Sequence, residues 1–141
     1  MKRRSNSQRG SVVVESASIS LVLLMLLIGI FDFAQMLFTH QALMERLRGA
    51  ARWGAISDPT NTTAITNLVL YNQTTTPSPA NGYFGLTSSN VQVSRDGTAA
   101  TDTDRLTVTI VSPPFKILSP FVAGNRTGQS LRVSVPLGRF N

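Results

Sequence analysis

The chain has 141 residues, with 13 lysines and arginines against 7 aspartates and glutamates, no cysteine and one histidine. The lack of cysteine excludes a disulfide framework and a cysteine-ligated metal site. The one histidine, His40, leaves little scope for a histidine metal cluster or a catalytic triad. Because the sequence holds no residue pattern for catalysis, we expect a protein that is not an enzyme and that binds neither a cofactor nor a metal.

The positive charge is concentrated on the two sides of an apolar segment. One group precedes the segment and another follows it: Lys2, Arg3, Arg4 and Arg9, then Arg46, Arg48 and Arg52. Basic residues beside an apolar segment are typical of membrane proteins, whereas a nucleic-acid-binding protein gathers them on one folded face. We therefore expect membrane lipid as a partner and no nucleic acid, with the N-terminal end cytoplasmic and the rest outside.

The apolar segment is long enough to cross a membrane as a helix. Residues 16–31 carry no charge, and as a helix they span roughly 24 Å of a hydrocarbon core about 30 Å thick. Apolar residues resume after Asp32 and extend the segment to residue 38. Beyond it, apolar residues recur at three- and four-residue steps. The sequence predicts one helix over residues 11–56, membrane-spanning in its first part and ended by Asp58-Pro59.

Three kinds of N-terminal segment begin with basic residues followed by an apolar run. A cleaved secretory signal peptide fits poorly, because the run is long and no small-residue cleavage site with a polar mature start follows it. An uncleaved signal anchor and a type IV prepilin-like N-terminus both predict the continuous helix.

A glutamate lies just inside the apolar segment, in the stretch RGSVVVES, where Glu15 follows Gly10 by five residues. This spacing resembles the class III signal of type IV pilins. The longer stretch RGSVVVESASISLVLLMLLIGIFDFAQ is similar to the opening of TadE-like proteins, which are minor pseudopilins of tight-adherence (Tad or Flp) pili. The resemblance covers residues 9–55. It implies a prepilin leader over residues 1–10, cleavage by a prepilin peptidase between Gly10 and Ser11, and Glu15 as the fifth mature residue. Ser16 departs from the family, which often has an aromatic residue there.

The position of Glu15 also has a physical explanation. A carboxylate inside the membrane costs about 2.5–3.5 kcal/mol on insertion scales. Cleavage would create an amino group on Ser11, one helical turn away, and the helix dipole at that end also favours an acid. The amine of the same chain or of a neighbouring subunit can thus compensate Glu15, and the second arrangement would set the register between subunits. Alternatively, Glu15 lies at the headgroup boundary.

Further polar residues lie along the predicted helix. Asp32 either contacts a packed neighbouring helix or marks the outer membrane boundary, and Gln35 nearby is also polar. Arg48 and Arg52, with Arg46, either meet anionic headgroups and acidic partner surfaces or form a solvated face. Trp53 is expected to pack the helix end against the globular part.

Residues 57–141 are predicted to form a globular, β-rich domain outside the membrane. Apolar spacing indicates a short helix over 62–72, with a strand as the alternative, followed by a turn-rich linker or loop over 73–82. Alternating residues indicate strands over 90–94, 105–112 and 130–137, and residues 113–124 read as a packed loop or a short turn of helix. The three strands make a small antiparallel sheet whose apolar face needs cover. The outer half of the long helix, near Met44, Leu47 and Ala51, supplies it. The fold class is α+β and pilin-like.

Two further patterns are interpreted as unspecific. Asp96, Asp102 and Asp104 match no calcium-loop spacing, because no closing glutamate follows them. Asn61, Asn72 and Asn125 fit the glycosylation acceptor pattern and are attributed to Asn- and Thr-rich loops.

Three functions remain open. The first is an assembly component (pseudopilin) of a Tad-type pilus in the bacterial inner membrane, acting with other pilins or pseudopilins, including copies of itself, and with the inner-membrane assembly machinery. The second is a principal filament subunit. The third is an uncleaved, signal-anchored envelope protein whose sheet binds a surface ligand.

Overall fold

A computed structural model describes residues 6–99, 101–115 and 126–137 of the chain. Predictions for residues 1–5, for 116–124 and for Asn125 lie outside this range. The described residues fall into two compact units, one holding α1 up to residue 35 and the other holding the described residues from 36 onward.

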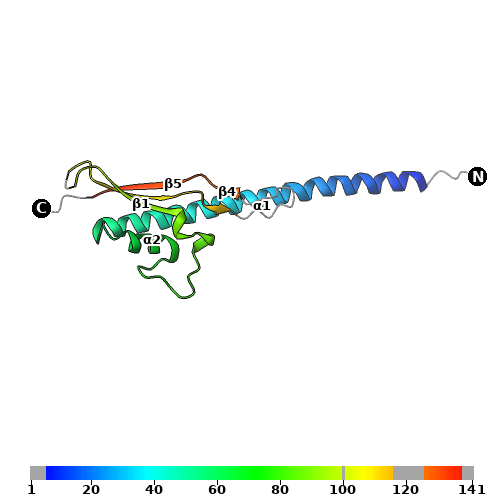
Figure 1. Cartoon of the computed structure of the whole chain (residues 1–141). Coiled ribbons are helices and arrows are strands. Elements are labelled where there is room, and N and C mark those ends of the chain that lie inside the picture. The colour runs from blue at the N-terminus through cyan, green and yellow to red at the C-terminus, as the bar shows by residue number, and fades with distance from the viewer. Residues whose placement is uncertain (1–5, 100, 116–125, 138–141) are drawn as a thin grey trace, which may run out of the picture. The chain divides into compact units, whose positions relative to one another are not determined.

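The first element is the long helix α1, Asn6–Ile56, which runs through both units and is coloured blue to green in Figure 1. The predicted end at Ile56 is confirmed, and the Ser57 amide donates to the Trp53 carbonyl at 2.8 Å. A residue before proline avoids helical geometry, so Asp58-Pro59 ends the helix. The start lies five residues earlier than predicted, because neither proline nor a capping motif interrupts the helix before Gly10.

The predicted second helix is confirmed as α2, Thr62–Tyr71. The Asn61 side chain caps its start by accepting the Ala64 amide at 3.0 Å. Asn72 ends it in the left-handed conformation (φ 61°), and its amide donates to the Leu68 carbonyl at 3.1 Å. Asn61 and Asn72, which fit the glycosylation acceptor pattern, therefore have a structural role as helix caps.

The predicted sheet is confirmed as three antiparallel strands: β1 Val91–Asp96, β2 Arg105–Ile110 and β5 Leu131–Pro136. Their order is β1-β2-β5, with Val108 opposite both Val93 and Val133. The loop predicted over 73–82 holds no helix or strand. Two short 3₁₀ turns, η1 Tyr83–Gly85 and η2 Ser88–Asn90, lead from it into β1.

The prediction of a loop or helical turn after β2 was wrong where it can be checked. Strand β3, Pro114–Phe115, pairs antiparallel with β4, Arg126–Thr127, as a second, two-stranded sheet. The Gly128 amide donates to the Pro113 carbonyl at 2.8 Å and extends this pairing. Proline lacks an amide donor and is confined in sheets to edge strands, to the first residue of a strand or to bulges. For this reason the proline-rich sequence was not predicted to form a strand.

The hydrophobic core lies between the later part of α1, α2 and the three-stranded sheet, which run side by side in Figure 1. The cover predicted from α1 is confirmed, with Leu47 and Ala51 fully buried and Met44 packed against the core. Gly54 lies where α1 meets both neighbours, because an added Cβ would come within 2.7 Å of Leu106 Cδ2 and 2.8 Å of Ile65 Cδ1. The fold is therefore α+β, with the helix packed on the sheet.

Candidate functional site

The first part of α1 exposes an apolar surface along its whole length. From residue 10 to residue 38 every side chain is exposed except Ile28 and Asp32, which are half-buried. By length and composition this is one helix able to cross a membrane. Soluble proteins rarely leave so much contiguous apolar surface in water, so the segment is suited to lipid or to apolar helices.

Three residues of the predicted processing and register site lie at the start of this surface. Gly10, Ser11 and Glu15 are helical and exposed, and a Cβ added at Gly10 would meet nothing within 4 Å. Ser11 and Glu15 are four residues apart on a continuous helix and therefore share one face. Nearby, the Ser18 hydroxyl donates to the Val14 carbonyl at 2.9 Å. This bond satisfies the hydroxyl within its own helix, as an apolar environment requires.

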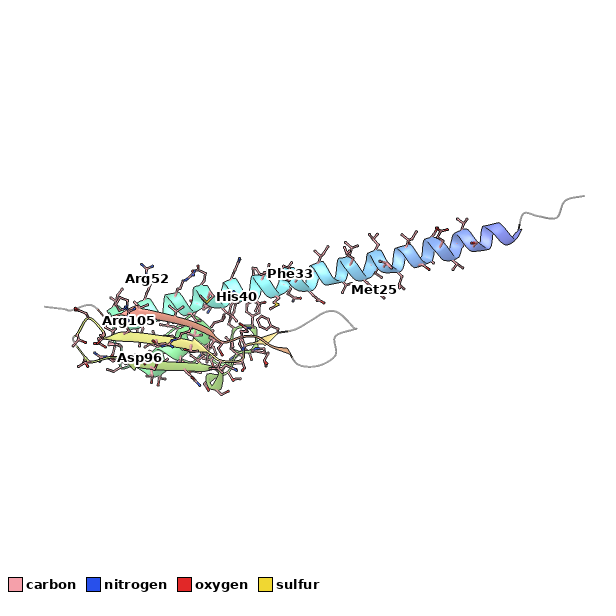
Figure 2. The ribbon with its side chains drawn as sticks, turned by 90° about the horizontal axis from the view of Figure 1, so that it is seen from above. Met25, Phe33, His40, Arg52, Asp96 and Arg105 are labelled. Atoms are coloured by element: carbon pink, nitrogen blue, oxygen red, sulfur yellow. The ribbon has the colours of Figure 1, made fainter. Side chains whose placement is uncertain are left out.

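The other predicted contact residues fall into different units of the structure. Asp32 is half-buried in the first unit, whereas Arg48 and Arg52 lie in the second. Figure 2 labels Arg52 on the later part of α1. Arg48 pairs with Glu45 at 3.2 Å, with 57% and 75% of these side chains exposed. Such an exposed pair contributes little to stability, so both arginines stay available to a partner.

Two grooves flank the exposed face of α1 in the second unit. One, of about 560 Å³, lies between Arg48, Arg52 and the half-buried Val133 and Val135 of β5. The other, of about 480 Å³, lies between α1 and the end of α2 and includes Arg46, Trp53 and Tyr83. Trp53 packs against the core there, as predicted.

Arg46 has a role that the sequence did not reveal. Its guanidinium carbon lies 4.1 Å from the centre of the Tyr83 ring, in a cation–π contact. Its buried Nη1 atom has no hydrogen-bond partner among the described residues. Arg46 was grouped with Arg48 and Arg52 by sequence, and only the position of Tyr83 in the folded chain separates it from them.

The aspartates that raised a calcium interpretation are used inside the sheet region. Asp104 is 2% exposed and accepts from Arg95 Nε at 2.7 Å and Nη2 at 2.5 Å. The hydrogen bond to Asp104 raises the pKa of Arg95 above its ordinary value. Asp96 accepts from the Thr107 hydroxyl at 2.8 Å and from Arg132 at 3.1 Å. Within the described ranges, no three acidic or histidine side chains gather as metal ligands do.

The comparisons with known proteins point to the helix. No curated protein and no solved structure matches this chain. The family model described as TadE-like protein matches residues 10–52, which include all the predicted processing, register and contact residues. The TadE-like family suggests a component associated with a Tad pilus. Residues 10–52 of this chain are thus similar to the TadE-like family.

Proposed function

We propose that this protein is a pseudopilin of a Tad-type pilus, cleaved after Gly10 by a prepilin peptidase and assembled through its hydrophobic helix. The observation that carries the proposal is the exposed apolar surface of α1, residues 10–38, with the carboxylate of Glu15 near its start and that of Asp32 near its outer end. That surface lies within the TadE-like match. Acids at membrane depth mark functional positions because they are costly unless a partner compensates them.

The partner of Glu15 in this proposal is the amino group that cleavage creates on Ser11. The helix places the two residues one turn apart, so the amine of the same chain or of the next subunit can reach the carboxylate. An amine from a neighbour fixes how far one helix is shifted along another. The pair therefore specifies the register of assembly more than it adds stability.

The proposed location follows from the same helix. The leader lies in the cytoplasm, α1 crosses the bacterial inner membrane once, and residues 57–141 lie outside it. The proposed partners are the prepilin peptidase, other pilins or pseudopilins, copies of this chain and the inner-membrane assembly machinery. Arg48 and Arg52, exposed beside the apolar side chains of Val133 and Val135, are available to acidic groups on those partners.

The first experiment determines the mature N-terminus in cells with an active prepilin peptidase. Cleavage predicts a chain that starts at Ser11, and a chain that retains Met1 would instead support the signal-anchored protein. Gly10→Val is the matched variant, because a side chain at Gly10 meets nothing in the structure. It should leave the fold intact and reduce cleavage, so a loss of processing reports recognition by the peptidase and not misfolding.

The second experiment separates cleavage from assembly. Glu15→Gln keeps the size of the side chain and removes its charge, so we expect normal cleavage but reduced incorporation into pili. Glu45→Gln is the control, because Glu45 is also an exposed glutamate of α1 but pairs with Arg48. Normal incorporation of Glu15→Gln would contradict the register role. The copy number in purified filaments then distinguishes a pseudopilin from a principal subunit.

A further inference from the structure

A row of aromatic side chains connects α1 to the 3₁₀ turn η1 in the second unit. The rings of Phe38 and Phe84 meet edge to face with centroids 6.3 Å apart, and the rings of Phe84 and Tyr83 are 4.4 Å apart. Tyr83 in turn lies under the guanidinium of Arg46. The row thus runs from an apolar end at Phe38 to a charged end at Arg46.

The apolar end of the row is open to the surroundings. Phe38 is 64% exposed and Phe84 is 38% exposed. Their neighbours Met36 and Leu37 on α1 are also exposed, at 52% and 47%. Rings that touch each other and still leave this much surface uncovered are not placed to complete the core.

The backbone of the turn is held in an unfavourable conformation that presents Phe84. Phe84 has φ 53° and ψ 24°, a left-handed conformation that bulky residues rarely adopt. The turn is fixed by two hydrogen bonds, from Gly85 to Gly82 at 3.0 Å and from Leu86 to Tyr83 at 3.1 Å. Leu86 anchors it in the core. Strain that a rigid surrounding maintains at an exposed residue points to a function for that residue.

The position of Phe38 along α1 indicates what covers the row. Phe38 is the last residue of the exposed apolar stretch of α1, residues 10–38, and the buried Thr39 follows it. If that stretch spans the membrane, as in the proposed function, Phe38 lies at its outer boundary. Phe84 contacts Phe38 and reaches the same level.

We infer that the Tyr83–Gly85 turn is a second membrane contact, in which Phe38 and Phe84 enter the outer boundary of the bilayer. Tyr83 and Arg46 follow at the headgroup level. Aromatic rings with an adjacent polar or cationic group are suited to this boundary. The guanidinium of Arg46, whose central carbon lies 4.1 Å from the centre of the Tyr83 ring, complements anionic headgroups. The contact would hold the globular part against the membrane before assembly, and it rests on the membrane placement in the proposed function.

The test measures membrane depth with single tryptophan reporters in the full chain. Trp53 is the only tryptophan of the sequence, so Trp53→Phe provides a background for Phe84→Trp and, separately, for Leu23→Trp. The proteins are reconstituted in vesicles of phosphatidylcholine and phosphatidylglycerol, whose acyl chains are brominated either near the headgroup or near the chain end. Bromine quenches tryptophan fluorescence only at close range.

We expect the Phe84→Trp reporter to be quenched several-fold more by bromine near the headgroup than by bromine near the chain end. The Leu23→Trp reporter should show the opposite order, and native Trp53 should be quenched little. Quenching of Leu23→Trp without any quenching of Phe84→Trp would overturn this inference alone. Failure of both would overturn the membrane placement itself. Shielding of Phe84→Trp that depends on protein density and not on bromine would assign the row to a second copy and also overturn the inference.

Two further variants guard against misfolding. Phe38→Trp reports the same depth from α1 without touching the turn, so it must give the same quenching order. Phe84→Asn suits the left-handed conformation and removes the ring. It should keep the unfolding midpoint at or above that of the parent chain while weakening the contact, seen as faster amide exchange of residues 83–86 in vesicles. A lower midpoint would show that Phe84 serves packing instead.

Discussion

The two parts of α1 use the same kind of helix in different ways. Residues 10–38 expose apolar side chains on every face, whereas residues 43–54 bury one face and expose the other. In the second stretch the buried positions follow a helical period and the exposed ones carry charge: Leu43, Leu47, Ala50, Ala51 and Gly54, against Glu45, Arg48 and Arg52. Apolar residues on one face are typical of a helix that lies between a core and water. Apolar residues on every face are typical of a helix that has no side facing water.

This difference shows that apolar content alone does not locate a core. The first stretch is richer in leucine than the second, yet it contributes no residue to the hydrophobic core formed by the described residues. A helix face is buried within the protein where charged residues occupy the opposite face of the same helix. The same substitution at two leucines of α1 should therefore have very different consequences.

The largest effect is expected for Leu47→Ala compared with Leu23→Ala. Leu47 is fully buried in the core and Leu23 is 59% exposed. Truncating a buried leucine loses its transfer free energy and leaves a cavity, so the free energy of unfolding should fall by about 2–5 kcal/mol. Denaturant unfolding of the full chain in detergent micelles, followed by Trp53 fluorescence, measures it.

Leu23→Ala is the matched control in the same helix. It should change the unfolding of the globular part by less than about 0.5 kcal/mol, as substitutions outside a core do. Similar losses for both variants would mean that the first stretch also stabilises the globular part, and the contrast drawn between the two stretches would be wrong.

A smaller effect is expected where the helix approaches its neighbours most closely. Gly54→Ala places a methyl group within 3.0 Å of the Leu106 and Ile65 side chains. These side chains have to shift, and overpacking of this kind costs about 1–3 kcal/mol. The measurement is the same unfolding experiment, with hydrogen exchange of α2 and β2 to locate the change.

Gly49→Ala tests the same substitution about one and a half turns earlier. A Cβ at Gly49 meets nothing within 4 Å, and alanine favours a helix over glycine by about 0.5–1 kcal/mol. Gly49→Ala should therefore raise the free energy of unfolding while Gly54→Ala lowers it. A gain at both positions would show that the contact at Gly54 is looser than described.

These glycines illustrate what the sequence alone could predict. The three strands, both helices and the buried face of α1 followed from alternation and helical spacing, because each of these patterns is local. Gly54 carried no such signal, since its contacts come from Ile65 on α2 and Leu106 on β2. The β3–β4 pairing was also missed, because a two-residue strand is too short to show a period.

The candidate site divides in the same way. Gly10, Ser11 and Glu15 were predicted from their spacing in the sequence and its resemblance to the pilin signal, which needs no knowledge of the rest of the fold. The contact of Arg46 with Tyr83 joins residues that are distant in the sequence. The pair formed by Arg95 and Asp104 lies nearer in the sequence but depends on how β1 and β2 are connected, and it buries Asp104. Neither contact follows from the spacing within a single helix or strand.

The smallest expected effect concerns the water-exposed corner at which α1 ends. Asp58 Oδ1 accepts the Thr60 hydroxyl at 2.6 Å and the Thr60 amide at 2.9 Å. These hydrogen bonds, the one from the hydroxyl first, lower the pKa of Asp58 below its ordinary value of 3.8. A carboxylate with a lowered pKa stabilises the folded state above its unfolded pKa, and that contribution is lost as the pH falls through the folded pKa.

The expected result is therefore a pH-dependent difference between the parent chain and Asp58→Asn. The parent should be slightly more stable at neutral pH, and the two should converge as the pH falls below 3.8, because a protonated carboxyl resembles the amide. Unfolding midpoints between neutral and acidic pH measure this difference. Thr60→Val removes the hydroxyl and should reduce the same dependence. A constant difference at every pH would show that the side chain of Asp58 acts through its shape and not its charge. Charge would then matter as little at this corner as it does along the largely uncharged first stretch of α1.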